Sequence, residues 1–330
     1  MFLTYPREER DLFLSWPISW PNLYSTRVST TCLCTWASYF LLTYNFSLVF
    51  RKGPTLEFRD TGYKSQSGHV TDARCRPDIT AALQGHWKGD VVPWPLIRLA
   101  GEVASKGTAH PDQPKHAMSY LHYLLLARPD LDVAQGLLID DKKVTFLFGI
   151  GGEGIRQFDV EWEVRDLNKL LYAFIYRLYE PGAFADSSYF TEVDEKTTVT
   201  YTITINYPGG PKECRGFYSI YARNPFATRT HVLSNPTFKV EENVLTILKD
   251  QLCRRHVNLH CELNILNDHV HIPEQVPGVV VAAYGEKIQP PLSKERSKHR
   301  LGLGESGLPF MGIPTLSDML ETLFDVLEGI

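Results

Sequence analysis

Apolar residues recur at two different spacings in the first half of the chain. Two stretches have them at three- and four-residue intervals, which predicts amphipathic helices from about residue 117 to Pro129 and from about residue 165 to 179. Other stretches are short and either apolar throughout or alternating, which is typical of strands. The expected strands are 94–103, 133–139, 144–150 and 155–162. This interleaving of helices and strands indicates a mixed α/β domain.

The pattern changes after about residue 195. Glu180-Pro181-Gly182 interrupts the second helix, and the polar, acidic residues 186–198 are expected to connect two domains. Beyond them, period-two alternation favours an antiparallel sheet. Its expected strands are 198–207, 216–221, 229–233 and 244–251. The predicted organisation is an unassigned segment 1–54, an α/β domain 55–195 and a strand-rich domain 196–330, in the mixed α/β or α+β fold class.

Residues 28–50 carry no charge and are followed by Arg51-Lys52, as a membrane-spanning helix often is. From Leu42 onward, however, large apolar residues alternate with smaller or polar ones, which favours a half-buried strand. The first ten residues lack the basic region and the cleavage site of a secretory signal. We therefore expect neither a membrane span nor export.

The composition narrows the functional class. The 330 residues carry a net charge of −4, which gives no overall positive field, so no nucleic-acid partner is expected. Six cysteines in a chain of this length are too sparse for a disulfide-stapled secreted domain and fit a reducing compartment. An intracellular protein, cytoplasmic or nuclear, is expected.

Three motifs suggest chemistry but have simpler explanations. Residues 149–154 match the G-x-G-x-x-G dinucleotide fingerprint, yet the residues that follow alternate as a returning strand, so a hairpin turn is expected. Four possible zinc ligands within nine residues match no common zinc spacing and favour a solvated helix face. These ligands are Cys253, His256, His260 and Cys261. The basic run 294–300 is expected to be an exposed loop, with a phosphate-binding patch as the alternative.

Lys249 ends a strand-like run, and Glu262 follows thirteen residues later in a helix-like stretch. A lysine on a strand, paired with a glutamate on the next helix, holds the ATP phosphates in protein kinases. Residues 276–286 supply the next strand after a Pro-Gly turn, and residues 301–310 are expected to form the strand and hinge beside an adenine. Residues 316–329 are then expected to form the helix that begins a larger lobe.

Five motifs make the chain resemble the fungal-type protein kinase family. They are Arg76-Pro77-Asp78-Ile79, the run from Ser119 to Asp130, Thr228-Arg229-Thr230-His231, the run from Val244 to Asp250, and Val276-Pro277-Gly278-Val279. The resemblance covers about residues 55–330. It implies an α/β N-terminal region joined to a protein-kinase-like domain in a basidiomycete protein, and phosphorylation of protein serine or threonine with ATP and magnesium.

The resemblance also implies roles for individual residues. Lys249 would bind the α- and β-phosphates of ATP and Glu262 would orient it, so these two are the expected catalytic pair. Residues 223–228 would cover the nucleotide, with Ala227 and Thr228 beside it. No metal-binding side chain is expected in this domain.

Two departures from the family limit the expected activity. The covering segment 223–228 contains no glycine, so its backbone cannot approach phosphate closely, which puts ATP affinity in doubt. Neither His-Arg-Asp nor Asp-Phe-Gly occurs in the 330 residues, so the catalytic base and the magnesium ligands are missing. We expect an incomplete kinase domain, truncated before the catalytic loop, that transfers no phosphate by itself.

The N-terminal domain suggests a second hypothesis. Pro77-Asp78, followed after an apolar strand by Glu102 and Ala104, resembles the Pro-Asp…(Asp/Glu)-x-Lys motif of restriction-endonuclease-like folds, in which carboxylates bind a metal ion. Ala104 stands where the motif has lysine, and Lys106 would point to the same side as Glu102 on a strand. An active metal-dependent nuclease, an inactive nuclease-like scaffold and an unrelated α/β core remain open. A third hypothesis is a non-catalytic interaction module with an unidentified protein partner.

Overall fold

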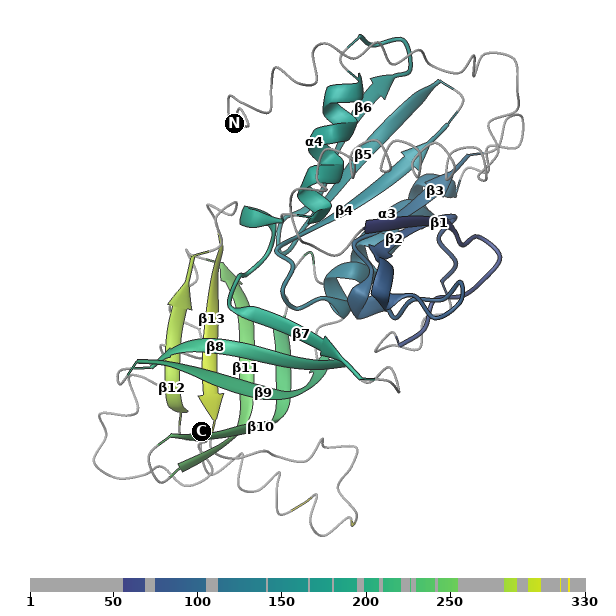
Figure 1. Cartoon of the computed structure of the whole chain (residues 1–330). Coiled ribbons are helices and arrows are strands. Elements are labelled where there is room, and N and C mark those ends of the chain that lie inside the picture. Colours follow the sequence, from purple (N-terminus) through teal and green to yellow (C-terminus); the bar gives the residue numbers. More distant parts are fainter. Residues whose placement is uncertain are drawn as a thin grey trace, which may run out of the picture.

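The computed structural model describes most of the chain between residues 56 and 303. The described residues are 56–68, 75–104, 112–140, 142–165, 167–179, 181–194, 199–207, 210–220, 226, 230–240, 243–254, 282–289, 296–303, 315 and 320. They form two β-sheets that follow one another in the chain, and the helices α3 and α4 accompany the first sheet (Figure 1). The fold is therefore mixed α and β, with a large share of strand.

The first sheet has six strands in the spatial order β1 to β6. These strands are β1 (Leu56–Asp60), β2 (Ile79–Leu83), β3 (Leu99–Val103), β4 (Val133–Ile139), β5 (Lys143–Ile150) and β6 (Gly154–Glu161). Neighbouring strands are antiparallel except β3 and β4, which are parallel because helix α3 (Gln113–Ala127) crosses over between them. Helix α4 (Leu167–Tyr179) follows β6. Both predicted helices and the predicted strands 133–139, 144–150 and 155–162 are confirmed.

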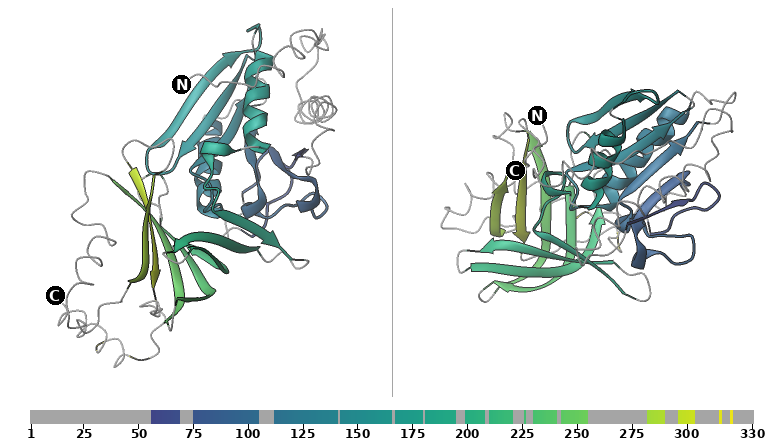
Figure 2. Two further views of the ribbon diagram at one scale, coloured as in Figure 1. Left: turned by 60° about the vertical axis from the view of Figure 1, so that its left-hand side comes forward. Right: turned by 45° about the horizontal axis from the view of Figure 1, so that its top comes forward.

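Each face of the first sheet is covered by one helix (Figure 2). Alternation along β4 sends Leu137 into the core beneath α4, where it packs with Phe174, and sends Ala134 into the core beneath α3 with Leu121. Helix α3 packs closely on the sheet, because a Cβ atom added at Gly136 would lie only 2.9 Å from Leu121 Cδ2. The first domain is thus a helix–sheet–helix sandwich.

The predicted strand 94–103 is interrupted. Residues Trp94–Leu96 form a short 3-10 turn, and β3 begins only at Leu99. Pro93 precedes this turn and Pro95 lies within it, and proline has no amide hydrogen to donate to a strand ladder. The prediction was therefore wrong for the first half of this segment and right for the second.

The G-x-G-x-x-G match forms the hairpin between β5 and β6, as predicted. Gly152 and Gly154 have φ angles of +75° and +115°, which glycine adopts without a steric penalty. The chain returns as β6, antiparallel to β5, instead of opening a helix. A dinucleotide-binding turn is excluded here because no helix N-terminus follows it.

The second sheet has seven strands in the order β12-β13-β11-β10-β9-β8-β7, all antiparallel. They are β7 (Tyr189–Val193), β8 (Val199–Tyr207), β9 (Gly210–Ile220), β10 (Thr230–Val240), β11 (Asn243–Arg254), β12 (Ala282–Ile288) and β13 (Arg296–Leu303). Since β7 belongs to it, this sheet begins before the predicted boundary near residue 195. The sheet curves so that Ile203 and Cys214, from β8 and β9, pack against Leu248 of β11 and Tyr284 of β12 (Figure 1).

The basic run 294–300 was predicted to be an exposed loop, and this prediction was wrong. Residues 296–303 form the buried strand β13, and Lys298 and Arg300 are only 2% and 0% exposed. Their charges are neutralised by carboxylates from elsewhere in the chain, so burial does not leave them uncompensated.

None of the described helices is long and apolar enough to cross a membrane.

Several expectations concern residues outside the described part. The uncharged stretch 28–50, the possible zinc ligands from His256 to Cys261 and the hinge predicted beyond Leu303 are not among the described residues. These expectations stay predictions.

Candidate functional site

Asp78 and Glu102 come together where β2 begins and β3 ends. Asp78 immediately precedes β2, and the register pairs Ile79 with Gly101, so one step further Asp78 comes opposite Glu102. Asp78 Oδ2 accepts a hydrogen bond of 3.0 Å from the backbone amide of Val103. Antiparallel pairing therefore joins the two carboxylates that the nuclease-like motif predicted as partners.

The turn after β1 fixes Asp78 from the other side. A Cβ at Gly62 would lie only 2.6 Å from Asp78 Oδ1, so this close approach requires glycine. The Thr61 amide donates to the Asp78 carbonyl at 2.9 Å, and the Thr61 hydroxyl donates to the Pro77 carbonyl at 2.6 Å. Both the backbone and the side chain of Asp78 are thus held in place.

Helix α3 places two polar side chains next to Glu102, one helical turn apart. His116 Nδ1 lies 3.7 Å from Glu102 Oε1, and the Tyr120 hydroxyl, which donates to the Arg76 carbonyl at 3.2 Å, also lies beside Glu102. Glu102 is 8% exposed, and its Oε2 has no hydrogen-bond partner among the described residues. A buried carboxylate oxygen without a partner is costly when the group is ionised.

Burial and the neighbouring Asp78 carboxylate raise the pKa of Glu102 to about 7. Burial also raises the pKa of Asp78, although the hydrogen bond from Val103 opposes this effect. Burial and the Glu102 charge raise the pKa of Tyr120. Near neutral pH this site therefore favours a proton or a cation between the two carboxylates over two bare negative charges.

The remaining elements of the nuclease-like motif are incomplete in the described residues. Ala104 stands at the lysine position and offers no ammonium group, while Lys106 lies outside the described part of the chain. Within that part, no three histidine, cysteine or acidic side chains are arranged to hold a metal ion. A cation at this site would rest on the carboxylates of Asp78 and Glu102, with water or backbone oxygen completing its shell.

Lys249 lies on β11, an inner strand of the second sheet. The strand continues to Arg254, so Lys249 lies within it and not at its end, and Lys249 pairs with Leu301 of β13 on one side and with β10 on the other. The residues predicted to act with it, Glu262, Ala227 and Thr228, lie outside the described part of the chain. The ion pair between Lys249 and Glu262 accordingly stays a prediction.

Alternation along β11 separates Lys249 from the buried Leu248 and Asp250 beside it. The described residues that share its face through the strand register include Ile247 and Gln251 on the same strand and His299, Leu301 and Leu303 on β13. Leu301 is fully buried, whereas Lys249 is half-buried. Lys249 therefore lies on a face that carries both aliphatic and polar side chains.

The segment predicted to cover the nucleotide has one described residue, Phe226. Its ring centroid lies 6.0 Å from that of His122 on α3, and a Cβ at Gly149 would lie 3.2 Å from Phe226 Cε1. At this residue the segment packs against the first domain.

A buried ionic cluster between the two domains was missed by sequence analysis. Arg300 donates to both carboxylate oxygens of Asp250 at 2.8 Å, and Tyr189 donates to Asp250 at 2.5 Å. Arg300 also donates to Asp186 at 3.1 Å and to Glu286 at 3.2 Å. One guanidinium group is thus surrounded by three carboxylates.

Lys298, two positions before Arg300 and on the same face of β13, extends this cluster to the first domain. Its Nζ lies 2.9 Å from Asp186 and 3.4 Å from Asp132, which precedes β4. Burial by itself would raise the pKa of Asp186, but the positive charges of Lys298 and Arg300 lower this pKa below its usual value. Lys298 and Arg300 are two positions apart, which is the spacing of side chains on one face of a strand and could have indicated β13. Their acidic partners are too distant in the sequence for a local pattern to identify them. Through Lys298 the cluster links the second sheet to Asp132 and Asp186.

Comparison of the sequence and structure with protein-family models, with curated proteins and with solved structures finds no match.

Proposed function

We propose that residues 196–330 belong to a protein-kinase-like small lobe of the fungal type, in which Lys249 binds the phosphates of ATP. The observation that carries this proposal is the position of Lys249 on β11. Counted from β9, β11 is the third strand, and protein kinases carry their phosphate-binding lysine on the third strand of the small lobe.

The strand order supports the same assignment. β11 lies between β10 and β13, which are the second and fifth strands counted from β9, and β12 forms the edge beyond β13. A protein-kinase small lobe has this antiparallel order, with a helix between its third and fourth strands. Residues 255–281 separate β11 from β12, which leaves room for such a helix.

The surroundings of Lys249 suit a ligand with an apolar ring and an anionic tail. Leu301 and Leu303 are its aliphatic neighbours on this face, beside the polar Gln251 and His299, and the ammonium group supplies a charge for phosphate. The pair of Asp250 with Arg300 lies on the opposite face of β11, so the nucleotide would lie on the Lys249 face. Because the 330 residues lack the two catalytic tripeptides, the proposed role is nucleotide binding without phosphate transfer by this chain alone.

Fluorescence anisotropy of an ATP analogue with magnesium tests the proposal. We expect saturable binding to the full chain and an affinity at least about tenfold lower in Lys249→Ala, because a charge-assisted contact contributes roughly 1.5–3 kcal/mol. Lys212→Ala, at an exposed position on β9, is the matched control and should bind as the unchanged protein does.

Equal affinities of Lys249→Ala and the unchanged protein would refute the assigned role. A chain that binds no nucleotide at all would instead favour the non-catalytic interaction module. Incubation with labelled ATP, magnesium and a generic protein substrate is expected to give no label transfer, and transfer abolished by Lys249→Ala would show an active kinase.

Oε2 of Glu102, which has no hydrogen-bond partner among the described residues, favours a second candidate function for the N-terminal domain. We propose that Asp78 and Glu102 bind a divalent cation in a nuclease-like site. The cation would supply Lewis-acid chemistry at a phosphate, while Asp78, held by Val103 and Gly62, would orient it. Since Ala104 replaces the lysine that would position water, we expect cation binding with little or no cleavage.

Thermal unfolding with magnesium or manganese at pH 8 tests the cation site. We expect the unfolding temperature to rise with the cation concentration, and this rise to be lost in Asp78→Ala. Glu163→Gln, at an exposed position, is the control and should keep the response. A plasmid cleavage assay with the same cations then decides whether nuclease activity accompanies binding; absence of any cation response would exclude the site.

A further inference from the structure

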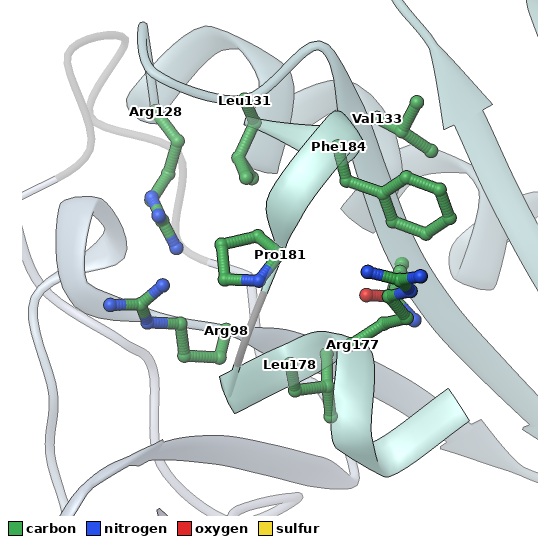
Figure 3. Close-up of a pocket in the computed structure, with 9 residues that line it drawn as sticks. Arg98, Arg128, Leu131, Val133, Arg177, Leu178, Pro181 and Phe184 are labelled. Carbon is green, nitrogen blue, oxygen red and sulfur yellow. The ribbon is translucent and has the colours of Figure 1, made fainter. Parts of the chain in front are cut away.

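A small cavity lies in the first domain, on the side where the chain leaves for the second sheet. It is small and partly open to solvent, and it lies between the end of α4, the 3-10 turn Gly182–Phe184 and the segment before β3. Its middle is apolar, with Leu178, Pro181 and Phe184, but two guanidinium groups, those of Arg98 and Arg128, lie side by side at one end (Figure 3). Such a combination is unusual, since adjacent positive charges repel each other.

Arg128 is anchored but retains donors. Its Nε and Nη2 bind both oxygens of Asp130, and its Nη1 donates to the Ile97 carbonyl at 3.0 Å. A guanidinium group has five N–H donors, so three bonds leave two donors unused by the described residues. Arg128 is 4% exposed, so bulk water reaches these two donors poorly.

Arg98 has no side-chain hydrogen bond to any described residue, although it lies against Arg128. The Arg128 charge, and then burial, lower the pKa of Arg98 to about 10. The same two arginines, after burial, lower the pKa of His86, whose Nδ1 is buried without a partner in the described structure. Among the described residues, Asp130 balances only one of the two guanidinium charges, so these residues leave an excess positive charge at this end of the cavity.

We propose that Arg98 and Arg128 form a binding site for a phosphate group, either as inorganic phosphate or as the terminal phosphoryl group of a larger molecule. Guanidinium groups bind phosphate oxygens through paired N–H donors, and an anion there would supply the negative charge that the described residues lack. The apolar wall formed by Pro181 and Phe184 strengthens such contacts by excluding water.

The position of the site suggests what its occupancy affects. Asp130, which anchors Arg128, accepts a backbone hydrogen bond of 2.7 Å from Asp186, and the Asp132 amide donates to the Phe184 carbonyl at 2.9 Å. Asp132 and Asp186 are the carboxylates that bind Lys298 of the second sheet. A bound phosphate group would therefore stabilise the segment that joins the two domains.

Thermal unfolding of the full chain, with potassium phosphate compared to potassium chloride at equal ionic strength, tests the proposal. We expect phosphate to raise the unfolding temperature of the unchanged protein. In Arg98→Gln the response should be lost, while the unfolding temperature in chloride should rise because the repulsion with Arg128 is removed. Arg156→Gln, on the exposed part of β6, is the matched control and should keep the phosphate response.

The outcomes separate this site from the proposed nucleotide site. Lys249→Ala should respond to phosphate as the unchanged protein does. A larger response to a phosphoserine peptide or to ATP than to inorganic phosphate, lost in Arg98→Gln, would identify the group as part of a larger molecule. An unchanged protein that phosphate does not stabilise, or an equal response in Arg98→Gln, would overturn the proposal.

Discussion

Replacing Glu102 by glutamine should stabilise the first domain at alkaline pH and much less at acidic pH. The substitution keeps the shape of the side chain and removes the charge that the site disfavours. In the folded protein Glu102 is 8% exposed, lies beside Asp78 and has one oxygen without a hydrogen-bond partner among the described residues. Ionisation there is consequently more costly than in the unfolded chain.

The magnitude follows from the pKa of Glu102, which is raised from 4.5 to about 7. A change of one in pKa corresponds to about 1.4 kcal/mol, so ionised Glu102 lowers the free energy of unfolding by about 3 kcal/mol. As the pH rises from 4.5 to 7, the unfolded chain loses the proton while the folded protein keeps it. The free energy of unfolding therefore falls through this interval and stays lower above it.

Urea unfolding at pH 5 and pH 8, followed by tryptophan fluorescence, measures this effect. Tryptophan occurs at positions 16, 20, 36, 87, 94 and 162 only, so no signal comes from the second sheet. Trp94 is fully buried in the same domain as Glu102. We expect Glu102→Gln to exceed the unchanged protein in free energy of unfolding by about 2–3 kcal/mol more at pH 8 than at pH 5.

The difference in free energy of unfolding between the variant and the unchanged protein at each pH cancels the contributions of the other titrating groups. Glu163→Gln makes the same chemical change at an exposed position and should give the same difference at both pH values. A stability difference for Glu102→Gln that does not depend on pH would refute the reasoning, since burial and Asp78 could then not be disfavouring the ionised form.

The remaining predictions concern the contact between the domains. Arg300→Leu should lower the free energy of unfolding by about 3–5 kcal/mol, because it leaves the Asp250 carboxylate buried without its cationic partner; urea unfolding measures the loss. Gly152→Ala should cost about 1–3 kcal/mol, since φ is +75° and the added Cβ would lie 2.7 Å from Leu252 Cδ2; calorimetry shows this as a lower unfolding temperature. Asp186 and Asp250 have pKa values below 3.8, so the stability they contribute is present above that pH and should be lost below it in a calorimetric pH series.

The elements that could be predicted from the sequence are those whose environment is local. Strands β4 and β5 and helix α3 have apolar residues at regular spacing, and their faces are decided by neighbours in the same domain. Strand β13 was missed because Lys298 and Arg300 look solvent-exposed to any local rule. Only their pairing with carboxylates as far away as Asp132 makes burial tolerable.

The site formed by Asp78 and Glu102 also has a part that the local sequence predicts and a part that depends on distant packing. The pairing of Asp78 with Glu102 followed from a motif and from the expectation that each borders a strand. Tyr120 and His116 could not be assigned to it from the sequence, because their positions depend on how α3 crosses the sheet. The raised pKa of Glu102 is likewise a property of packing, which no residue spacing specifies.

The ionic cluster also limits how the chain can be divided for experiments. A recombinant fragment that starts near residue 195 would lack Asp132, Asp186 and strand β7, and would retain Lys298 and Arg300 without part of their counter-charge. Such a fragment should be poorly soluble or poorly folded even if the sheet it contains is intact in the full chain. Biochemical work on the strand-rich half is therefore best done with both halves in one polypeptide.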